Sequence, residues 1–342
     1  MLSRIFLTLL TAIAVTGCSS KTASKTKTPA KSGTKTTAEA IDTQSPAVEP
    51  KSRRFKFVYG AAISQLTPGA KARVWIPVAQ SSHDQKITLG KITTPGEYRV
   101  TKEKKFGNRV IYFEATANDA GQIPLSVEYE VERREVLANS GETFDEAQRE
   151  LFLAASAKVP VDGSLKASLL GDRPLVGEGI ELGRGLYNVV EDHMKYSKTD
   201  PGWGRGDAAW ACDSKFGNCT DFHSLFIGVS RDLKVPAKFE IGFPLPPQRG
   251  AGNISGYHCW AKFASGARWV GVDISEADKD PTLKDYCFGN LTENRVTFTT
   301  GRDLTLDPPP AAGPVNFLVY PYVEVDGKPH KKFKKGFRYE DL

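Results

Sequence analysis

The residues of this 342-residue chain best suited to chemistry are a cysteine, a histidine and an aspartate in that order. Cys219 precedes an apolar stripe with helical spacing, from Phe222 to Leu233, so we expect it at the N-terminus of a helix that ends before Pro236. The partial positive charge and free amides at a helix N-terminus favour a thiolate over a thiol and could face a developing oxyanion. Cys219 is therefore the candidate nucleophile.

A predicted β-hairpin downstream carries the other two residues. Residues 257–264 and 268–274 are typical of strands joined by a turn at Gly266, with His258 near the start of the first and Asp273 near the end of the second. Positions about equidistant from a hairpin turn face one another, so the imidazole and the carboxylate can meet. This predicts His258 as the general base and Asp273 as the group that fixes its tautomer.

Several motifs in this region resemble the transglutaminase-like superfamily of papain-type cysteine enzymes. They are Gly217-Asn218-Cys219-Thr220-Asp221-Phe222, Arg231, Val235-Pro236-Ala237, His258-Cys259-Trp260-Ala261 and Trp269-Val270-Gly271-Val272-Asp273. The resemblance covers residues 178–275 well and implies an α+β core, in which the helix carrying the cysteine packs on an antiparallel sheet. Lys238 and Lys262 depart from the pattern, where an arginine and an acidic residue are common, and both could alter the substrate groove.

The resemblance implies attack of the thiolate on an amide carbonyl, a thioester acyl-enzyme and transfer to water or an amine. Because bacterial members look mostly hydrolytic, a peptidase or amidase acting on protein or peptide is preferred over a cross-linking transglutaminase. A non-catalytic binding module that keeps the pocket is a further alternative. The family places an aromatic or amide oxyanion donor upstream of the nucleophile, for which Tyr196, Trp203 and Trp210 are candidates.

Other reactive residues carry weaker signals. His223, one helical turn after Cys219, is expected to be structural, although it could touch substrate. In an oxidising compartment, Cys212 and Cys259 are the favoured disulfide pair among the remaining cysteines. A zinc site of Cys212, Cys219, His223 and Cys259 is disfavoured because no CxxC or HExxH spacing is present. No metal and no cofactor are expected, since phosphate-loop, nucleotide and calcium-loop motifs do not occur either.

The N-terminus is typical of an exported bacterial lipoprotein. Arg4 precedes an apolar run, residues 5–15, that is too short to span a bilayer, and Val15-Thr16-Gly17-Cys18 resembles a lipobox. Residues 1–18 are therefore expected to be a signal peptide that ends in a lipidated Cys18, with an ordinary cleaved signal peptide as the alternative. By analogy, Ser19 favours anchoring in the outer membrane of the cell envelope over the inner one.

Residues 19–54 are rich in Ser, Thr, Lys, Ala and Pro and are expected to form a disordered tether. The basic excess of the chain lies in this N-terminal part. Nine of the 46 Lys and Arg and three of the 40 Asp and Glu precede residue 55, so 37 of each remain after it. The net charge of +6 therefore does not indicate a nucleic-acid-binding face.

The rest of the chain is expected to contain two domains. Residues 55–138 alternate between apolar and polar side chains and contain regular turn signals, which predicts a small β-sandwich. Residues 139–342 are assigned to the catalytic domain with its C-terminal strands. Helices are expected in it at 143–159, with a capping box of Thr143 and Glu146, and at 178–196.

Overall fold

The computed structural model describes residues 49–342. The predicted signal peptide, Cys18 and the tether as far as residue 48 lie outside the described residues. The tether prediction is too long at its end, because strand β1 (Ser52–Ile63) already includes residues 52–54. Arg53 is buried there and donates hydrogen bonds to the Asp341 carboxylate, so its charge is paired rather than left in an apolar setting. Within residues 49–342, no helix is both long and apolar enough to cross a membrane.

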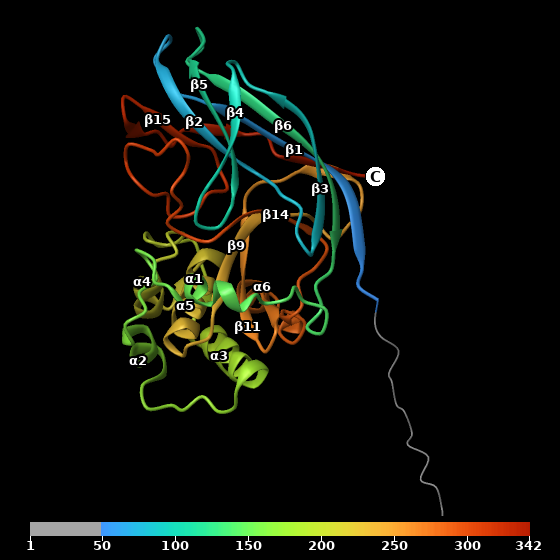
Figure 1. Ribbon diagram of the computed structural model, residues 1–342, viewed down its shortest axis with the longest axis vertical. Coiled ribbons are helices and arrows are strands. Elements are labelled where there is room, and N and C mark those ends of the chain that lie inside the picture. The colour runs from blue at the N-terminus through green and yellow to red at the C-terminus, as the bar shows by residue number, and fades with distance from the viewer. Residues whose placement is uncertain (1–48) are drawn as a thin grey trace, which may run out of the picture. The chain divides into compact units, whose positions relative to one another are not determined.

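Two antiparallel sheets form the sandwich part of the fold (Figure 1). Besides β1, their strands are β2 (Lys71–Val78), β3 (Gln85–Thr93), β4 (Tyr98–Lys102), β5 (Arg109–Thr116), β6 (Ile123–Arg134), β10 (Ala251–Asn253), β15 (Tyr322–Val325), β16 (Lys328–Pro329), β17 (Phe333–Lys335) and β18 (Arg338–Asp341). One sheet has the order β10-β18-β1-β6-β3, with β17 also paired to β1, and the other has the order β16-β15-β2-β5-β4. The predicted alternation is confirmed in β1, where Phe55, Phe57 and Tyr59 are buried.

The sandwich is not confined to residues 55–138. Strands β15 to β18 and the short β10 come from the segment assigned to the catalytic domain, yet they pair with β1, β2 and one another. A sheet edge presents unpaired backbone groups, and these late strands cover the free sides of β1 and β2. Such pairing cannot be read from local sequence, because it joins residues nearly 300 positions apart, such as Phe55 and Asp341.

The part that carries the three candidate residues is built on a third sheet, with the order β13-β12-β11-β9-β14. Its strands are β9 (Ala237–Pro244), β11 (His258–Ser265), β12 (Arg268–Val272), β13 (Phe288–Gly289) and β14 (Arg295–Thr300). The helices are α1 (Arg149–Leu153), α2 (Ser164–Leu170), α3 (Gly179–His193), α4 (Ala208–Ser214), α5 (Cys219–Asp232) and α6 (Ile274–Lys279). Figure 1 shows α1 to α5 beside β9 and β11, and Phe226 of α5 packs edge-on against Phe263 of β11. The fold is thus α+β, with the cysteine-bearing helix packed on an antiparallel sheet as predicted.

The predicted helix at 143–159 is wrong. Only a 3-10 turn at Glu146–Gln148 and the five-residue α1 form there, and Asp145 rather than Thr143 provides the cap. Thr143 instead forms a bridge to Arg268 at the tip of the β11–β12 hairpin. A tertiary contact therefore overrides the local helical pattern. The second prediction holds, since α3 spans Gly179–His193 and ends where Lys195 and Tyr196 form the short strand β7.

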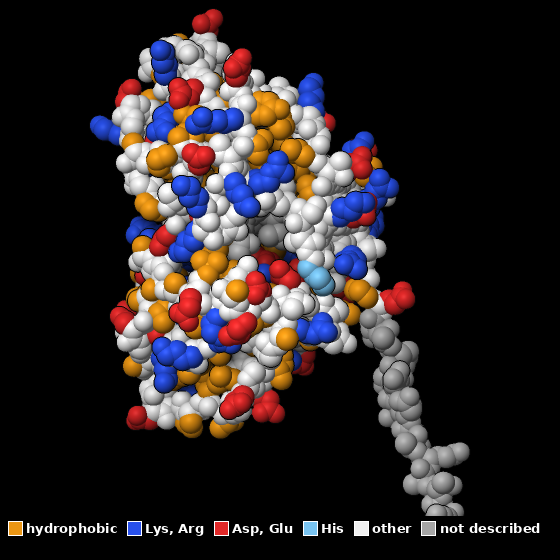
Figure 2. Space-filling view, viewed as in Figure 1, with side chains coloured by type: hydrophobic (Ala, Val, Ile, Leu, Met, Phe, Trp, Pro, Cys, Tyr) orange, Lys and Arg blue, Asp and Glu red, His pale blue; other side chains and the backbone are white. Residues whose placement is uncertain are grey.

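The third sheet and the sandwich share one core. The Phe57 ring of β1 lies 5.3 Å from Phe243 and 5.5 Å from Phe298 of the third sheet. Lys262 of β11 forms a buried ion pair with Asp84, which precedes β3. The lysine that departs from the family pattern thus joins two parts of the fold. Figure 2 shows Lys and Arg interspersed with Asp and Glu on the face in view, in keeping with the balanced composition after residue 54.

Candidate active site

Cys219 is the first residue of α5, and a capping box fixes the helix start. The Asn218 side chain accepts a hydrogen bond from the Thr220 amide at 2.9 Å, and the Asp221 carboxylate accepts one from the Asn218 amide at 2.9 Å. This arrangement satisfies amides that have no partner within the helix. Cys219 itself is 3% exposed, so its thiol works in a nearly dry environment.

His258 and Asp273 meet at the end of the hairpin. His258 Nε2 lies 2.8 Å from Asp273 Oδ2, and both side chains are buried. The strand register pairs Ala261 with Val272, so the two residues are diagonal neighbours on one face rather than directly opposite. Asp273 leaves the other ring nitrogen, Nδ1, free, and a hydrogen bond between the His258 side chain and the Cys219 thiol lowers the pKa of that thiol.

The three groups shift one another's proton affinities. Burial raises the pKa of the Cys219 thiol, but hydrogen bonds with Cys259 and His258, together with the imidazolium charge, lower it well below its usual value. Burial lowers the pKa of His258, but the charge and hydrogen bond of Asp273 outweigh this and raise it to about 10. The arrangement therefore favours a thiolate beside an imidazolium, which is the reactive form of a cysteine nucleophile.

Arg295 is a member of this array that sequence reasoning missed. It lies at the start of β14, with Nη1 3.0 Å from Asp273 Oδ2 and its guanidinium 4.7 Å from the centre of the Trp260 ring. Burial raises the pKa of Asp273, whereas the charges of His258 and Arg295 hold it far below the usual range. No motif surrounds Arg295 in the sequence, so only the pairing of β14 with β9 reveals it.

His223 joins the two elements that carry the array. Its Nδ1 donates to the Cys219 carbonyl at 2.8 Å, and its Nε2 accepts from the Ile274 amide at 3.1 Å. Both nitrogens are used, so the ring is neutral and links the start of α5 to the start of α6, and burial lowers its pKa to about 4. A zinc ion at the alternative site would have to displace these two bonds.

The predicted disulfide between Cys212 and Cys259 is wrong, because both are free thiols. Cys259 lies on the face of β11 toward α5, where its thiol hydrogen-bonds with Cys219 and its Sγ is 3.7 Å from His223 Nδ1. Cys212 lies on α4, where its carbonyl accepts a hydrogen bond from His193. Buried Cys287 is also free, and burial raises its pKa to about 12. The sulfur beside Cys219 is therefore Cys259.

The three candidate oxyanion donors occupy different settings. Tyr196 is half-buried, and burial followed by the negative charge of Cys219 raises its pKa, so its hydroxyl stays protonated near the nucleophile. Trp210 packs edge-on against Phe216, with ring centres 5.2 Å apart. Trp203 is 36% exposed, with the Lys198 ammonium 5.7 Å from its ring. Tyr196 is thus the candidate whose surroundings include the Cys219 charge.

The segment that carries these candidate residues is also similar to known proteins. Residues 177–274 match the family model of the transglutaminase-like superfamily, and they include Cys219, His258 and Asp273. The chain contains a transglutaminase-like domain. It is 27% identical over 337 residues to an uncharacterized protein of Haemophilus influenzae, in a match that covers 84% of this chain and 89% of that protein.

A crystal structure from Cytophaga hutchinsonii, described as that of a "putative cysteine protease", shares the fold with a TM-score of 0.54 and 14% identity. The match covers 86% of this chain and all of that one, so the similarity includes the sandwich as well as the transglutaminase-like domain. The family match and the array of thiol, imidazole and carboxylate support an enzyme of the cysteine type.

Two buried side chains hold the loop that precedes α4 in the transglutaminase-like domain. The Asp221 carboxylate accepts hydrogen bonds from the amides of Gly204 and Gly206 at 2.7 and 2.9 Å. Arg302 donates to the Gly206 carbonyl at 2.7 Å and to Ser224 on α5. Gly206 has a φ of +58°, and a Cβ there would lie 2.6 Å from the Arg302 guanidinium, so this position requires glycine. The loop is thereby fixed against the start of α5.

The site also contains a group with metal-ligand geometry. Atoms of His258, Asp273 and Glu276 all lie within 4.8 Å of one another. However, the Arg295 guanidinium already lies 3.0 Å from Asp273, and the Lys279 ammonium pairs with Glu276. Both carboxylates are thus balanced by cations of the chain, which disfavours a further cation here.

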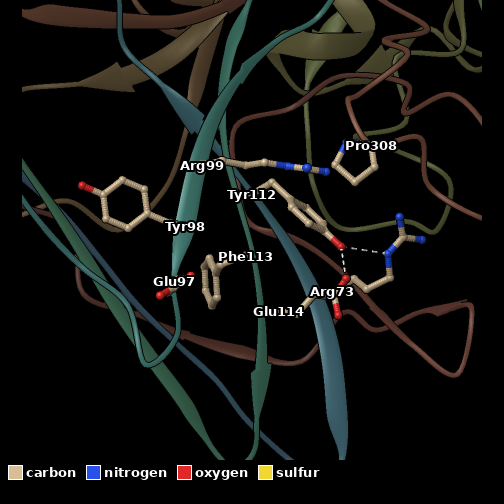
Figure 3. Close-up of a pocket in the computed structure, with 8 residues that line it drawn as sticks. All are labelled: Arg73, Glu97, Tyr98, Arg99, Tyr112, Phe113, Glu114 and Pro308. Atoms are coloured by element: carbon tan, nitrogen blue, oxygen red, sulfur yellow. Dashed lines mark hydrogen bonds between the residues drawn. The ribbon is translucent and has the colours of Figure 1, made fainter.

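A separate hollow of about 540 Å³ lies on the sandwich, away from the predicted site residues (Figure 3). Its wall includes Arg73 and Tyr112, and Arg73 Nε donates to the Tyr112 hydroxyl at 3.2 Å. That hydroxyl donates in turn to Glu114, and the Arg99 guanidinium covers the Tyr112 ring at 5.0 Å. Arg73, Tyr112 and Glu114 of this hollow therefore bind one another, and none of the catalytic candidates lines it.

Proposed function

We propose that the chain is an exported, lipid-anchored cysteine peptidase or amidase that acts on protein or peptide amides. The observation that carries the proposal is the arrangement of Cys219, His258 and Asp273, in which the Asp273 carboxylate lies 2.8 Å from His258 Nε2 and the His258 side chain also hydrogen-bonds with the Cys219 thiol. The lowered pKa of Cys219 and the raised pKa of His258 support the reactive ion pair.

In the proposed reaction, the Cys219 thiolate attacks the amide carbonyl carbon and forms a tetrahedral intermediate. The Cys219 amide and the Tyr196 hydroxyl would donate hydrogen bonds to the oxyanion. The His258 imidazolium gives its proton to the leaving nitrogen, the C–N bond breaks and a thioester remains. His258 then takes a proton from water, whose oxygen attacks the thioester. Collapse of that intermediate releases the acid and restores the thiolate, with His258 protonated again.

Hydrolysis is preferred over transfer to an amine because the motifs resemble those of bacterial members that look mostly hydrolytic. The lipobox at Val15-Thr16-Gly17-Cys18 supports a site of action in the cell envelope. Cys18 would carry the lipid anchor there, with the outer membrane as the preferred location.

The decisive experiment is labelling of the full chain with an iodoacetamide probe, with the modified peptide identified by mass spectrometry. We expect rapid labelling of Cys219 at neutral pH, loss in Cys219→Ala and strong slowing in His258→Ala. Cys287→Ala is a matched control, because this buried thiol lies outside the array and should leave the Cys219 rate unchanged. Equal labelling of Cys219 in wild type and His258→Ala contradicts the proposal.

A second measurement separates the two possible acyl acceptors. At an amine concentration low enough for water to be the main acceptor, a peptide library should be cut without incorporating an added primary amine, whereas a cross-linking enzyme would release ammonia while joining glutamine to that amine. Membrane fractionation of wild type and Cys18→Ala in a bacterial host tests the anchor, and we expect the variant to lose membrane association.

A further inference from the structure

A cleft of about 390 Å³ borders the transglutaminase-like domain's histidine and has no role in the reaction as described so far. Its apolar wall is formed by Pro244, Leu245, Pro247, Leu283 and Tyr286. These residues come from the end of β9, the loop after it and the segment after α6, so packing of separate elements shapes the cleft. Its volume lies in the range of sites that bind small molecules or single side chains.

The proposed proton transfer from His258 determines which part of a substrate lies beside this cleft. The leaving nitrogen must receive its proton from His258, so the residue that follows the cleaved bond lies on the histidine side of the nucleophile. His258 lines the cleft, and Cys219 is not among its lining residues. The cleft is therefore placed for the amine side of the substrate rather than for the acyl side.

The charges around the cleft indicate what kind of group it takes. Arg295 and the His258 imidazolium are the cations among its lining residues, and both already pair with the buried Asp273 carboxylate. Glu276 adds a negative charge 3.7 Å from His258 Nε2. A free substrate carboxylate would thus meet the Glu276 carboxylate and no lining cation that lacks a partner. An apolar side chain instead finds apolar walls, including Leu283, which is 39% exposed and would be covered on binding.

We infer that this cleft binds a large apolar side chain of the residue that directly follows the cleaved amide. The inference rests on the proposed cysteine acyl-transfer function and narrows its substrate class to peptides with an apolar residue on the leaving side, inside a longer chain. Because the leaving amine and an attacking amine pass through the same transition state, the cleft also selects among added amines.

The test uses added amines, because an attacking amine passes through the same transition state as a leaving amine. The full chain is acylated with a small activated ester, and the thioester is partitioned between leucinamide and glycinamide at equal concentrations, with the two amide products measured by mass spectrometry. We expect about tenfold or more preference for leucinamide, since apolar pockets discriminate aliphatic side chains on that scale. Leu283→Glu should reduce the ratio to near one. Val176→Glu, at a valine that is 78% exposed and does not line the cleft, should retain it.

The outcomes separate this inference from the proposed function. Failure to form a thioester on Cys219 overturns the proposed function and the inference with it. Formation of the thioester with no preference for leucinamide overturns the inference alone. A preference that survives Leu283→Glu also overturns it, provided that the variant forms the thioester at the wild-type rate, which shows that the array is intact.

Discussion

The Arg295 guanidinium lies 3.0 Å from Asp273 Oδ2, the same oxygen that lies 2.8 Å from His258 Nε2. A buried carboxylate thus lies between two cations, one that transfers protons in the proposed reaction and one that does not. The ring of Trp260 lies against both, with its centre 4.7 Å from the Arg295 guanidinium and 6.0 Å from the His258 ring. Arg295 is in this way a positioning residue, because it holds the carboxylate that orients the histidine.

Arg295→Gln is expected to destabilise the fold by about 3 kcal/mol, because it removes one of the two cations that balance the buried Asp273 carboxylate. Urea unfolding followed by tryptophan fluorescence measures the change. Arg249→Gln is the matched control, since Arg249 is half exposed, pairs with Asp341 at 3.7 Å and should change stability by about 0–1 kcal/mol. Equal unfolding midpoints for the two variants would refute this account of Arg295.

The pH dependence of kcat/KM for a peptide substrate should be bell-shaped. Activity rises as the pH passes the lowered pKa of Cys219, because the thiolate forms, and falls as the pH passes about 10, because His258 loses its proton. Asp273→Asn removes the charge that raises the pKa of His258, so the basic limb should move down toward the ordinary histidine value of about 6.5. Activity should also fall on the order of 10³–10⁴-fold. An unmoved basic limb in Asp273→Asn argues against an orienting carboxylate.

Asp221→Ala should free the loop before α4. The substitution leaves the amides of Gly204, Gly206 and Asn218 without their shared acceptor, at a cost of about 1–3 kcal/mol for the unsatisfied donors. Hydrogen exchange of the Gly204 and Gly206 amides should accelerate. The control is Asp145→Ala, which removes the cap of the 3-10 turn before α1 and should leave these two amides protected. Unchanged protection in Asp221→Ala would show that other contacts hold the loop.

The parts of the site that the sequence predicts are those with local signals. The apolar stripe after Cys219 and the short turn near Gly266 place the nucleophile on a helix and the other two residues on a hairpin, and α5, β11 and β12 have those bounds within a few residues. The prediction that His258 and Asp273 lie opposite one another was off by two positions, which still leaves them on the same face as diagonal neighbours. Apolar periodicity and turn length depend on residues that are close together in the sequence, so the elements they predict are also found in the structure.

The parts that the sequence does not predict depend on distant partners. Arg295 reaches Asp273 only because β14 pairs with β9, and Arg302 reaches Gly206 from nearly a hundred residues away. The disulfide prediction failed for the same reason. The distance between the two cysteines depends on how the helix and the strand that carry them pack, which the sequence does not show. Lys262 stands where the family commonly has an acidic residue. Its ion pair with Asp84 of the sandwich accounts for the lysine, and this contact exists only in the folded chain.

The thiol of Cys259 is expected to tune the nucleophile. Its hydrogen bond with Cys219 favours the thiolate, so Cys259→Ala should raise the pKa of Cys219 and move the acid limb of iodoacetamide labelling to higher pH. A hydrogen bond to a charged group contributes about 1.5–3 kcal/mol, which corresponds to roughly one to two pH units.

The basic limb of peptide hydrolysis should stay in place, because it belongs to His258 and Asp273. Cys259→Ser keeps a donor and should shift the acid limb less, and Cys287→Ala should not shift it. Coincident acid limbs for wild type and Cys259→Ala would mean that His258 alone sustains the thiolate.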